Sequence, residues 1–165
     1  DETAQLIRDV FERQDRIIQN RDVLEELLVR AHVEAKLAWD LGANEDQMSP
    51  ILQDIRHAQW RWDYAAASHG GSFHSPLETS RVISTGIHTA QEGRIKLSRL
   101  LFELGHPDEV AYPDIATKAK AQAFIGMDAA ALKAEKEAFL ERVTPQWDAK
   151  AAEREAQYPV KSLFD

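Results

Sequence analysis

The stretch VFERQDRIIQNRDVLEELLVRAHVEAKLAWDLG, residues 10–42, decides the fold of this chain. Its apolar side chains recur every seven residues on one seam and continue on the adjoining seam: Val10, Ile17, Leu24, Ala31 and Ala38, with Leu6, Leu28 and Ala35. Polar residues interrupt the stripe at Gln14 and Arg21, but the pattern is otherwise typical of a coiled-coil-like helix. Gly42 ends it, as a glycine just past a helix does. At about 1.5 Å per residue this helix reaches roughly 55–60 Å, so we expect a partner surface beyond its own domain.

The rest of the chain predicts further helices and no strand. A second helix begins either after Asn44 or after Ser49, with Pro50 at its first position, and ends at the Gly-Gly pair 70–71. A third runs from Ser75-Pro76, with Glu78 at the capping-box position, to the glycine at 105. Prolines make 106–116 an extended connector, and a short helix follows over 117–125. Asp128 caps a final helix that Pro145 interrupts. The fold class is therefore all-α, a long-helix bundle without a sheet.

The composition predicts one helical domain, residues 1–165, and excludes several classes of protein. Apolar residues make up 44% of the 165 residues, enough for a buried core. The formal charge of −8 and the lack of any Lys/Arg run argue against nucleic-acid binding. No apolar run is long enough to span a membrane, and the N-terminal residues do not form a secretory signal. The chain has no cysteine, so it cannot form a disulfide or attach a c-type haem itself.

Candidate chemistry is concentrated in RHAQWRWDYAAASHGGSFHSP, residues 56–76. His69 and His74 lie in the loop after the second helix, where Gly70 and Gly71 allow the backbone to approach a bulky group closely. A neutral imidazole is a good ligand for zinc or haem iron. Spacing alone leaves two alternatives open: one or both histidines ligate a metal, or the segment is an ordinary helix connection with solvated imidazoles.

Other residues of interest have simpler interpretations. Trp60 and Trp62 are two apart on a helix, so they point to different sides. Burial of each is expected; the alternative is that one packs in the core and the other faces a partner or cofactor. His57 is expected to pack between helices. His32 and His88 lack a second ligand one turn away and are interpreted as structural. The sequence Glu103-x-x-His106 is half of a di-iron motif, but the glycine between them ends the helix, so we reject that assignment.

Several motifs together resemble one family. RHAQWRWD at 56–63, ASHG at 67–70 and HSPLE at 74–78 are similar to the C-terminal region of the ammonia-forming cytochrome c nitrite reductases. Further matches follow in the same order: PDI at 113–115, KAKAQ at 118–122, IG at 125–126, KAEK at 133–136 and PQW at 145–147. The resemblance covers essentially the whole chain and is weaker over residues 1–45.

The resemblance implies an oxidoreductase as the parent protein. Members of that family are periplasmic, calcium-containing homodimers that carry several c haems and reduce nitrite to ammonium with six electrons. By the match, His74 corresponds to the distal axial ligand of one electron-relay haem, whereas His69 matches no ligand position. The family's haem-attachment motifs, catalytic residues and calcium ligands have no counterpart in this sequence. Long C-terminal helices form the family's dimer interface.

The sequence therefore predicts a C-terminal dimerisation and haem-capping domain that is inactive alone. Its expected partners are a second copy of the chain, the haem-bearing N-terminal part of the same polypeptide and a redox donor protein. For the dimer contact, the heptad stripe of the first helix and the apolar face of residues 87–104 are the candidate surfaces. One alternative is a stand-alone helical interaction module without a cofactor. Another is a helical protein that binds metal or haem non-covalently through His69 and His74.

Overall fold

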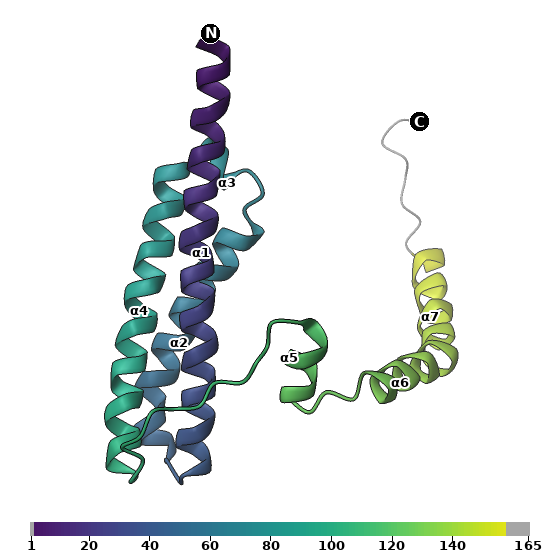
Figure 1. The fold of residues 1–165 in the computed structure, drawn as a ribbon. Helices are drawn as coiled ribbons and strands as arrows, with labels where there is room; N and C mark the ends of the chain where they lie inside the picture. The colour runs from purple at the N-terminus through teal and green to yellow at the C-terminus, as the bar shows by residue number, and fades with distance from the viewer. Residues whose placement is uncertain (1, 158–165) are drawn as a thin grey trace. The chain divides into compact units, whose positions relative to one another are not determined.

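The computed structural model describes residues 2–157, and over that range the chain is all α-helical, as predicted. Its helices, in order, are α1 (Glu2–Asp40), α2 (Glu45–Ala67), α3 (Gly71–His74), α4 (Pro76–Glu103), α5 (Lys118–Phe124), α6 (Ala129–Arg142) and α7 (Thr144–Gln157) (Figure 1). No residue from 2 to 157 lies in a β-strand. Among these residues, no helix combines the length and the apolar character that a bilayer span requires.

The chain divides into two compact units after Tyr112. The first holds α1 to α4 and the connector that follows them; the second holds α5 to α7. The assignment of all 165 residues to one domain stays a prediction.

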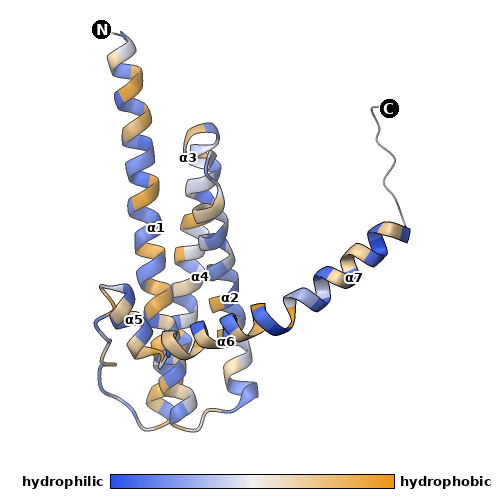
Figure 2. Ribbon diagram, turned by 90° about the vertical axis from the view of Figure 1, so that its right-hand side faces the viewer, coloured by the Kyte–Doolittle hydropathy of each residue, from blue (hydrophilic) through white to orange (hydrophobic). Residues whose placement is uncertain are grey.

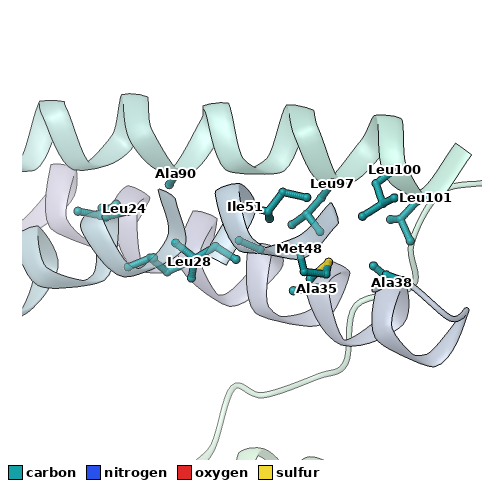
Figure 3. Packing of buried hydrophobic residues seen from close by; sticks show 14 of the residues in the cluster. Leu24, Leu28, Ala35, Ala38, Met48, Ile51, Ala90, Leu97, Leu100 and Leu101 are labelled. Atoms are coloured by element: carbon teal, nitrogen blue, oxygen red, sulfur yellow. The ribbon is translucent and has the colours of Figure 1, made fainter. Parts of the chain in front are cut away.

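The first unit is a bundle of three long helices, α1, α2 and α4, which lie side by side (Figure 1). α4 packs against both of the others along most of its length. The core combines leucine and isoleucine with many alanines (Figure 3): Ile17, Leu24, Leu28, Ala31, Ala35, Ala38, Ala43, Met48, Ile51, Ile55, Ala58, Ile83, Ala90, Leu97, Leu100 and Leu101. The heptad positions from Ile17 onward thus face the core, as the periodicity indicates.

Small residues on α4 bring the three helices close together. A Cβ atom on Gly86 would lie 2.6 Å from Cδ2 of Leu24, and one on Gly93 would lie 3.2 Å from Cβ of Asp54. Ala90, fully buried, lies between the two glycines. Because interiors are close-packed, glycine at these positions sets the spacing between α4 and its neighbours.

Glycines with positive φ end the helices where the sequence predicts. Gly42 has φ +93°, and the amide of Ala43 donates to the carbonyl of Ala38 at 3.0 Å, which is a Schellman motif. Gly105 ends α4 in the same way, with φ +87° and a bond from the His106 amide to the Leu101 carbonyl at 2.9 Å.

The start of α2 settles one alternative that the sequence leaves open. Asn44 is the N-cap, and it forms a capping box with Gln47: each side chain accepts from the other residue's amide at 3.0 Å. Pro50 lies inside the helix rather than at its first position. The capping box therefore sets the helix start. Pro50 has no N–H group, so α2 continues through this position without one backbone hydrogen bond.

The capping box predicted at the start of α4 is wrong. The side chain of Ser75 makes no capping hydrogen bond, although Pro76 does begin the helix. Glu78 binds the guanidinium of Arg81 instead, with Nε–Oε2 at 2.7 Å and Nη2–Oε1 at 2.5 Å. This charge-assisted pair competes successfully for the carboxylate, and its hydrogen bonds lower the pKa of Glu78.

The N-terminal turns of α1 continue past the end of the bundle (Figure 1). The apolar side chains on them, including Leu6, Ile7 and Phe11, are exposed, and they alternate with polar ones along the helix (Figure 2). The first part of the heptad stripe is therefore not covered by the bundle.

The second unit has no buried residue among 113–157. Thr117 caps α5 and Asp128 caps α6, as the sequence predicts. The helix that Pro145 interrupts is divided into α6 and α7, whose side chains meet where Phe139 and Trp147 stack edge to face at 5.3 Å. Apolar side chains of this unit remain exposed: Phe124, Ile125, Met127, Leu132, Phe139, Leu140 and Trp147.

Candidate functional site

The C-terminal half of α2 presents an exposed aromatic face. Trp60 and Tyr64 are one turn apart, and their exposed fractions are 68% and 51%. Large aromatic side chains bury well in most proteins, so two on one exposed face mark a surface suited to a partner or cofactor.

Trp62 lies on the other side of α2, half-buried and packed against the core. Its indole Nε1 is buried without a hydrogen-bond partner. The expectation that each tryptophan is buried is therefore wrong for Trp60, and the alternative of one tryptophan inward and one outward describes the structure. His57 is exposed, which contradicts the expectation that it packs between helices.

The connection from α2 to α4 contains a short helical turn, α3, that the sequence does not predict. The amides of Phe73 and His74 both donate to the carbonyl of Gly70, at 3.1 and 2.8 Å. The buried hydroxyl of Thr79, in the first turns of α4, donates to the carbonyl of Ser75 at 3.0 Å. His74 is thus the last residue of a turn held at both ends, rather than part of an open loop.

The imidazole of His74 is exposed and makes no hydrogen bond. Its ring packs edge to face against Phe73, with the centroids 4.9 Å apart. Gly70 also lies beside the ring: a Cβ there would be 3.0 Å from Cδ2 and 3.7 Å from Nε2 of the ring. An exposed imidazole without a hydrogen-bond partner has a ring nitrogen that could be donated to a metal or haem iron.

The described part of the chain does not bring several metal-ligating side chains together. Among residues 2–157, no group of three or more His, Cys, Asp or Glu side chains is placed to hold a metal ion. His69 is exposed in the same connection as His74, and only its backbone is fixed, by a 3.0 Å bond to the Ala67 carbonyl. His32 and His88 are exposed on α1 and α4.

A partly buried ionic cluster around Glu34 lies at the opposite end of the bundle from His74, and sequence reasoning missed it. Glu34 of α1, 5% exposed, accepts two bonds from Nε of Arg94 at 3.0 and 3.1 Å and one from Nη2 at 2.6 Å. The hydroxyl of Tyr112 donates to Glu34 at 2.6 Å and accepts from Arg94 at 3.1 Å. Arg30 stacks on the Tyr112 ring, 4.9 Å from its centroid. The cluster fixes the connector onto α1 and α4.

The cluster shifts the pKa of two of its members. Hydrogen bonding to Glu34 raises the pKa of Arg94. Burial, and then the hydrogen bond to Glu34, raises the pKa of Tyr112. A cavity of about 300 Å³ adjoins the cluster, and His106 lines it with a buried Nε2 that has no partner. One signal in the sequence points to this site: Glu34 stands among alanines on the buried face of the first helix.

Comparison with known proteins identifies a family. The sequence model of cytochrome c552 matches residues 1–157. Similar proteins named cytochrome c-552 occur in Porphyromonas gingivalis (50% identical over 147 residues, 89% of this chain), Parabacteroides distasonis (49% over 148 residues, 90%) and Bacteroides thetaiotaomicron (50% over 146 residues, 88%). In each case the match covers 30% of the relative, so the chain spans under a third of the length of the curated relatives it matches.

Proposed function

The chain belongs to the cytochrome c552 family, and from that membership we propose that it supplies a haem ligand and a dimerisation surface to a multihaem nitrite reductase. The similarity of RHAQWRWD, ASHG and HSPLE to the ammonia-forming nitrite reductases supports nitrite as the substrate of the full protein. The sequence contains no cysteine, and the relatives are more than three times as long as the matched segment. We therefore place haem attachment, the catalytic residues and the calcium site in other parts of the full protein.

One observation carries the proposal: the imidazole of His74 is exposed and free of hydrogen bonds, and the backbone that carries it is held at the end of a short turn. An axial ligand must present an unprotonated nitrogen along one direction. The turn supplies the direction, because the Gly70 carbonyl accepts two of its amides and Thr79 anchors the following residue. His69 has no comparable constraint on its side chain, so we assign ligation to His74 alone.

The aromatic face of α2 has a second role in this proposal. Bound haem supplies electron transfer through its iron. The exposed side chains of Trp60 and Tyr64 then pack against the haem-bearing part of the protein, and they exclude water from the surface that leads to His74. Taking apolar haem-facing surface out of water stabilises the assembled protein in proportion to the area covered.

The long helices are proposed to carry a homodimer contact. The two candidate stripes are largely occupied within the bundle, since Leu24, Leu97 and Leu101 are buried. The exposed apolar side chains of the long helices remain available for the contact: Leu6, Ile7, Phe11, Ile18 and Val23 on α1, and Leu77, Ile95 and Phe102 on α4. Sedimentation at tens of micromolar protein tests this, and a monomer throughout would contradict it.

We propose a periplasmic location, with a redox protein as electron donor, as for the family it resembles.

The ligand assignment is tested in the longer cytochrome polypeptide that contains this segment, expressed with its haems. His74→Ala is expected to convert one low-spin haem signal in the electron paramagnetic resonance spectrum to high spin. His69→Ala, an exposed histidine of the same connection, is the matched control and should leave the spectrum unchanged. An unchanged spectrum for His74→Ala would exclude His74 as a ligand. The 165-residue chain alone is expected to show no Soret band and no nitrite consumption.

A further inference from the structure

We propose that Gly70 is a positioning residue for His74: the side chain that Gly70 lacks leaves the space in which the imidazole lies. The inference rests on the proposed function, because it concerns how that imidazole meets a haem. Gly70 itself touches neither iron nor substrate in this proposal. It acts through the ring of His74.

The backbone at Gly70 does not itself require glycine. Its φ is −103° and its ψ is −4°, a right-handed conformation that any residue with a side chain adopts. The described glycines that do need positive φ are Gly42, Gly105 and Gly126, each of which ends a helix. A different reason must therefore account for glycine before α3.

That reason is the space beside the ring of His74. A Cβ on Gly70 would lie 3.0 Å from Cδ2 and 3.7 Å from Nε2. The first distance is tighter than ordinary carbon–carbon contact, so the ring of His74 would have to move by a few tenths of an ångström to admit a methyl group. The edge of the imidazole that carries Nε2 is the edge that faces Gly70.

One ring contact and one backbone hydrogen bond hold His74 in the turn. Phe73 packs edge to face against the imidazole, and the His74 amide is held by the Gly70 carbonyl at 2.8 Å. The backbone of the turn is therefore fixed, while the exposed ring is free to rotate about its own side-chain bonds. An added methyl group would turn the ring and leave the turn in place. It would also lie 3.7 Å from Nε2, one of the two ring nitrogens that could hold a haem iron.

Gly71 differs from Gly70, and this gives a comparison within the same turn. A Cβ on Gly71 would lie 3.0 Å from both Cβ of Ser68 and Oγ1 of Thr79, and not against His74. Thr79 is buried, so it has little room to move. Gly71→Ala is expected to weaken the turn, whereas Gly70→Ala is expected to keep the turn and displace the imidazole.

The first experiment uses nuclear magnetic resonance on the 165-residue chain. The wild type should show a nuclear Overhauser effect between the Cδ2 proton of His74 and the α-protons of Gly70. In Gly70→Ala the ring signals of His74 should shift, while the unfolding temperature changes by no more than about 2 °C. Ser72→Ala, a change in the same turn, should preserve the effect and the ring signals. The absence of the effect in the wild type, or unshifted ring signals in Gly70→Ala, would overturn the proposal.

The second experiment uses the haem-loaded longer polypeptide. Gly70→Ala should convert part of the low-spin signal of the His74-ligated haem to high spin and shift that haem's reduction potential; Ser72→Ala should do neither. If His74→Ala removes the low-spin signal but Gly70→Ala leaves it intact, the positioning role is wrong and the ligand assignment stands. If His74→Ala changes nothing, the proposed function itself fails.

Discussion

Among single residues, Arg94 is the one whose loss is expected to cost most stability. Arg94→Ala leaves the carboxylate of Glu34, 5% exposed, with only the hydroxyl of Tyr112 as a partner. Removing one member of a buried ion pair typically costs about 3–5 kcal/mol, because the other charge stays buried. Unfolding in urea, followed by circular dichroism, measures the loss.

Lys96→Ala is the matched control for that substitution. Lys96 binds Asp54 at 2.6 Å, also between α4 and a neighbouring helix, but its side chain is 41% exposed. We expect a loss below about 1 kcal/mol for this pair. The double variant Glu34→Leu/Arg94→Met should regain most of the loss, since it removes the buried carboxylate together with its partner. Equal losses for Arg94→Ala and Lys96→Ala would contradict the buried-pair interpretation.

Tyr112 should make stability fall at alkaline pH. Burial and the bond to Glu34 raise its pKa from 10.0, so the folded state favours the neutral hydroxyl. Its contribution is fully present below pH 10 and is lost as pH rises through the folded pKa, because the unfolded chain ionises first. Tyr112→Phe should cost about 1 kcal/mol at neutral pH and flatten the decline above pH 10. Free energies of unfolding measured from pH 7 to 11 decide this, and parallel curves for the two proteins would refute it.

The sequence contains Glu34, Arg94 and Tyr112 without indicating that they meet. The carboxylate and the guanidinium are 60 residues apart, and the hydroxyl is 78 residues from Glu34. Spacing within a helix reveals partners three or four positions away, whereas these contacts depend on how α1 and α4 pack. The same limit applies to the ring of His74. The family motif indicates His74 as a ligand, but the contact of its ring with Gly70 depends on the turn α3, which the sequence does not predict.

At the scale of helices, Gly86 controls the distance between α4 and α1. Gly86→Ala gains helix propensity of up to about 1 kcal/mol, but its Cβ would lie 2.6 Å from Cδ2 of the fully buried Leu24. Overpacking of this kind costs about 1–3 kcal/mol, so we expect a net loss of stability. Ser84→Ala, on the exposed side of the same helix, should gain a few tenths of a kcal/mol. Urea midpoints of the two variants measure the contrast, and stabilisation by Gly86→Ala would show that the helices separate at no cost.

Helix ends were the most predictable part of the fold, because their signals are local. Gly42, Gly105 and Asp128 act within a few residues of themselves, and each lies at a helix end as expected. The start of α2 needed the structure to choose Asn44 over Pro50. The capping box at Glu78 failed because Arg81, three residues on, binds the same carboxylate.

At the scale of the whole molecule, the heptad stripe predicts which residues of α1 lie in the core. It does not predict how far along α1 the neighbouring helices extend. Positions from Ile17 to Ala38 are buried by α2 and α4, yet Leu6 on the same helix is 62% exposed. Periodicity describes the faces of one helix and says nothing about the length of its neighbours. The sequence does not indicate the division after Tyr112 for the same reason. Residues 113–157 have sequences that form helices as readily as the bundle does, and the two units differ only in how much of each is buried.

The two units should differ sharply in local stability when the 165-residue chain is studied alone. Residues 113–157 have no buried side chain, whereas α4 contributes Ile83, Leu97 and Leu101 to the core. Amides open locally with free energies that follow such burial. We expect amides of α5 to α7 to exchange with solvent at least about 1,000-fold faster than core amides of α4, a difference of roughly 4 kcal/mol. Hydrogen exchange read by mass spectrometry gives both rates in one experiment.

Equal protection would mean that the second unit buries its exposed Leu132, Phe139 and Trp147 in solution. Dilution of the protein would then tell whether a second copy covers them.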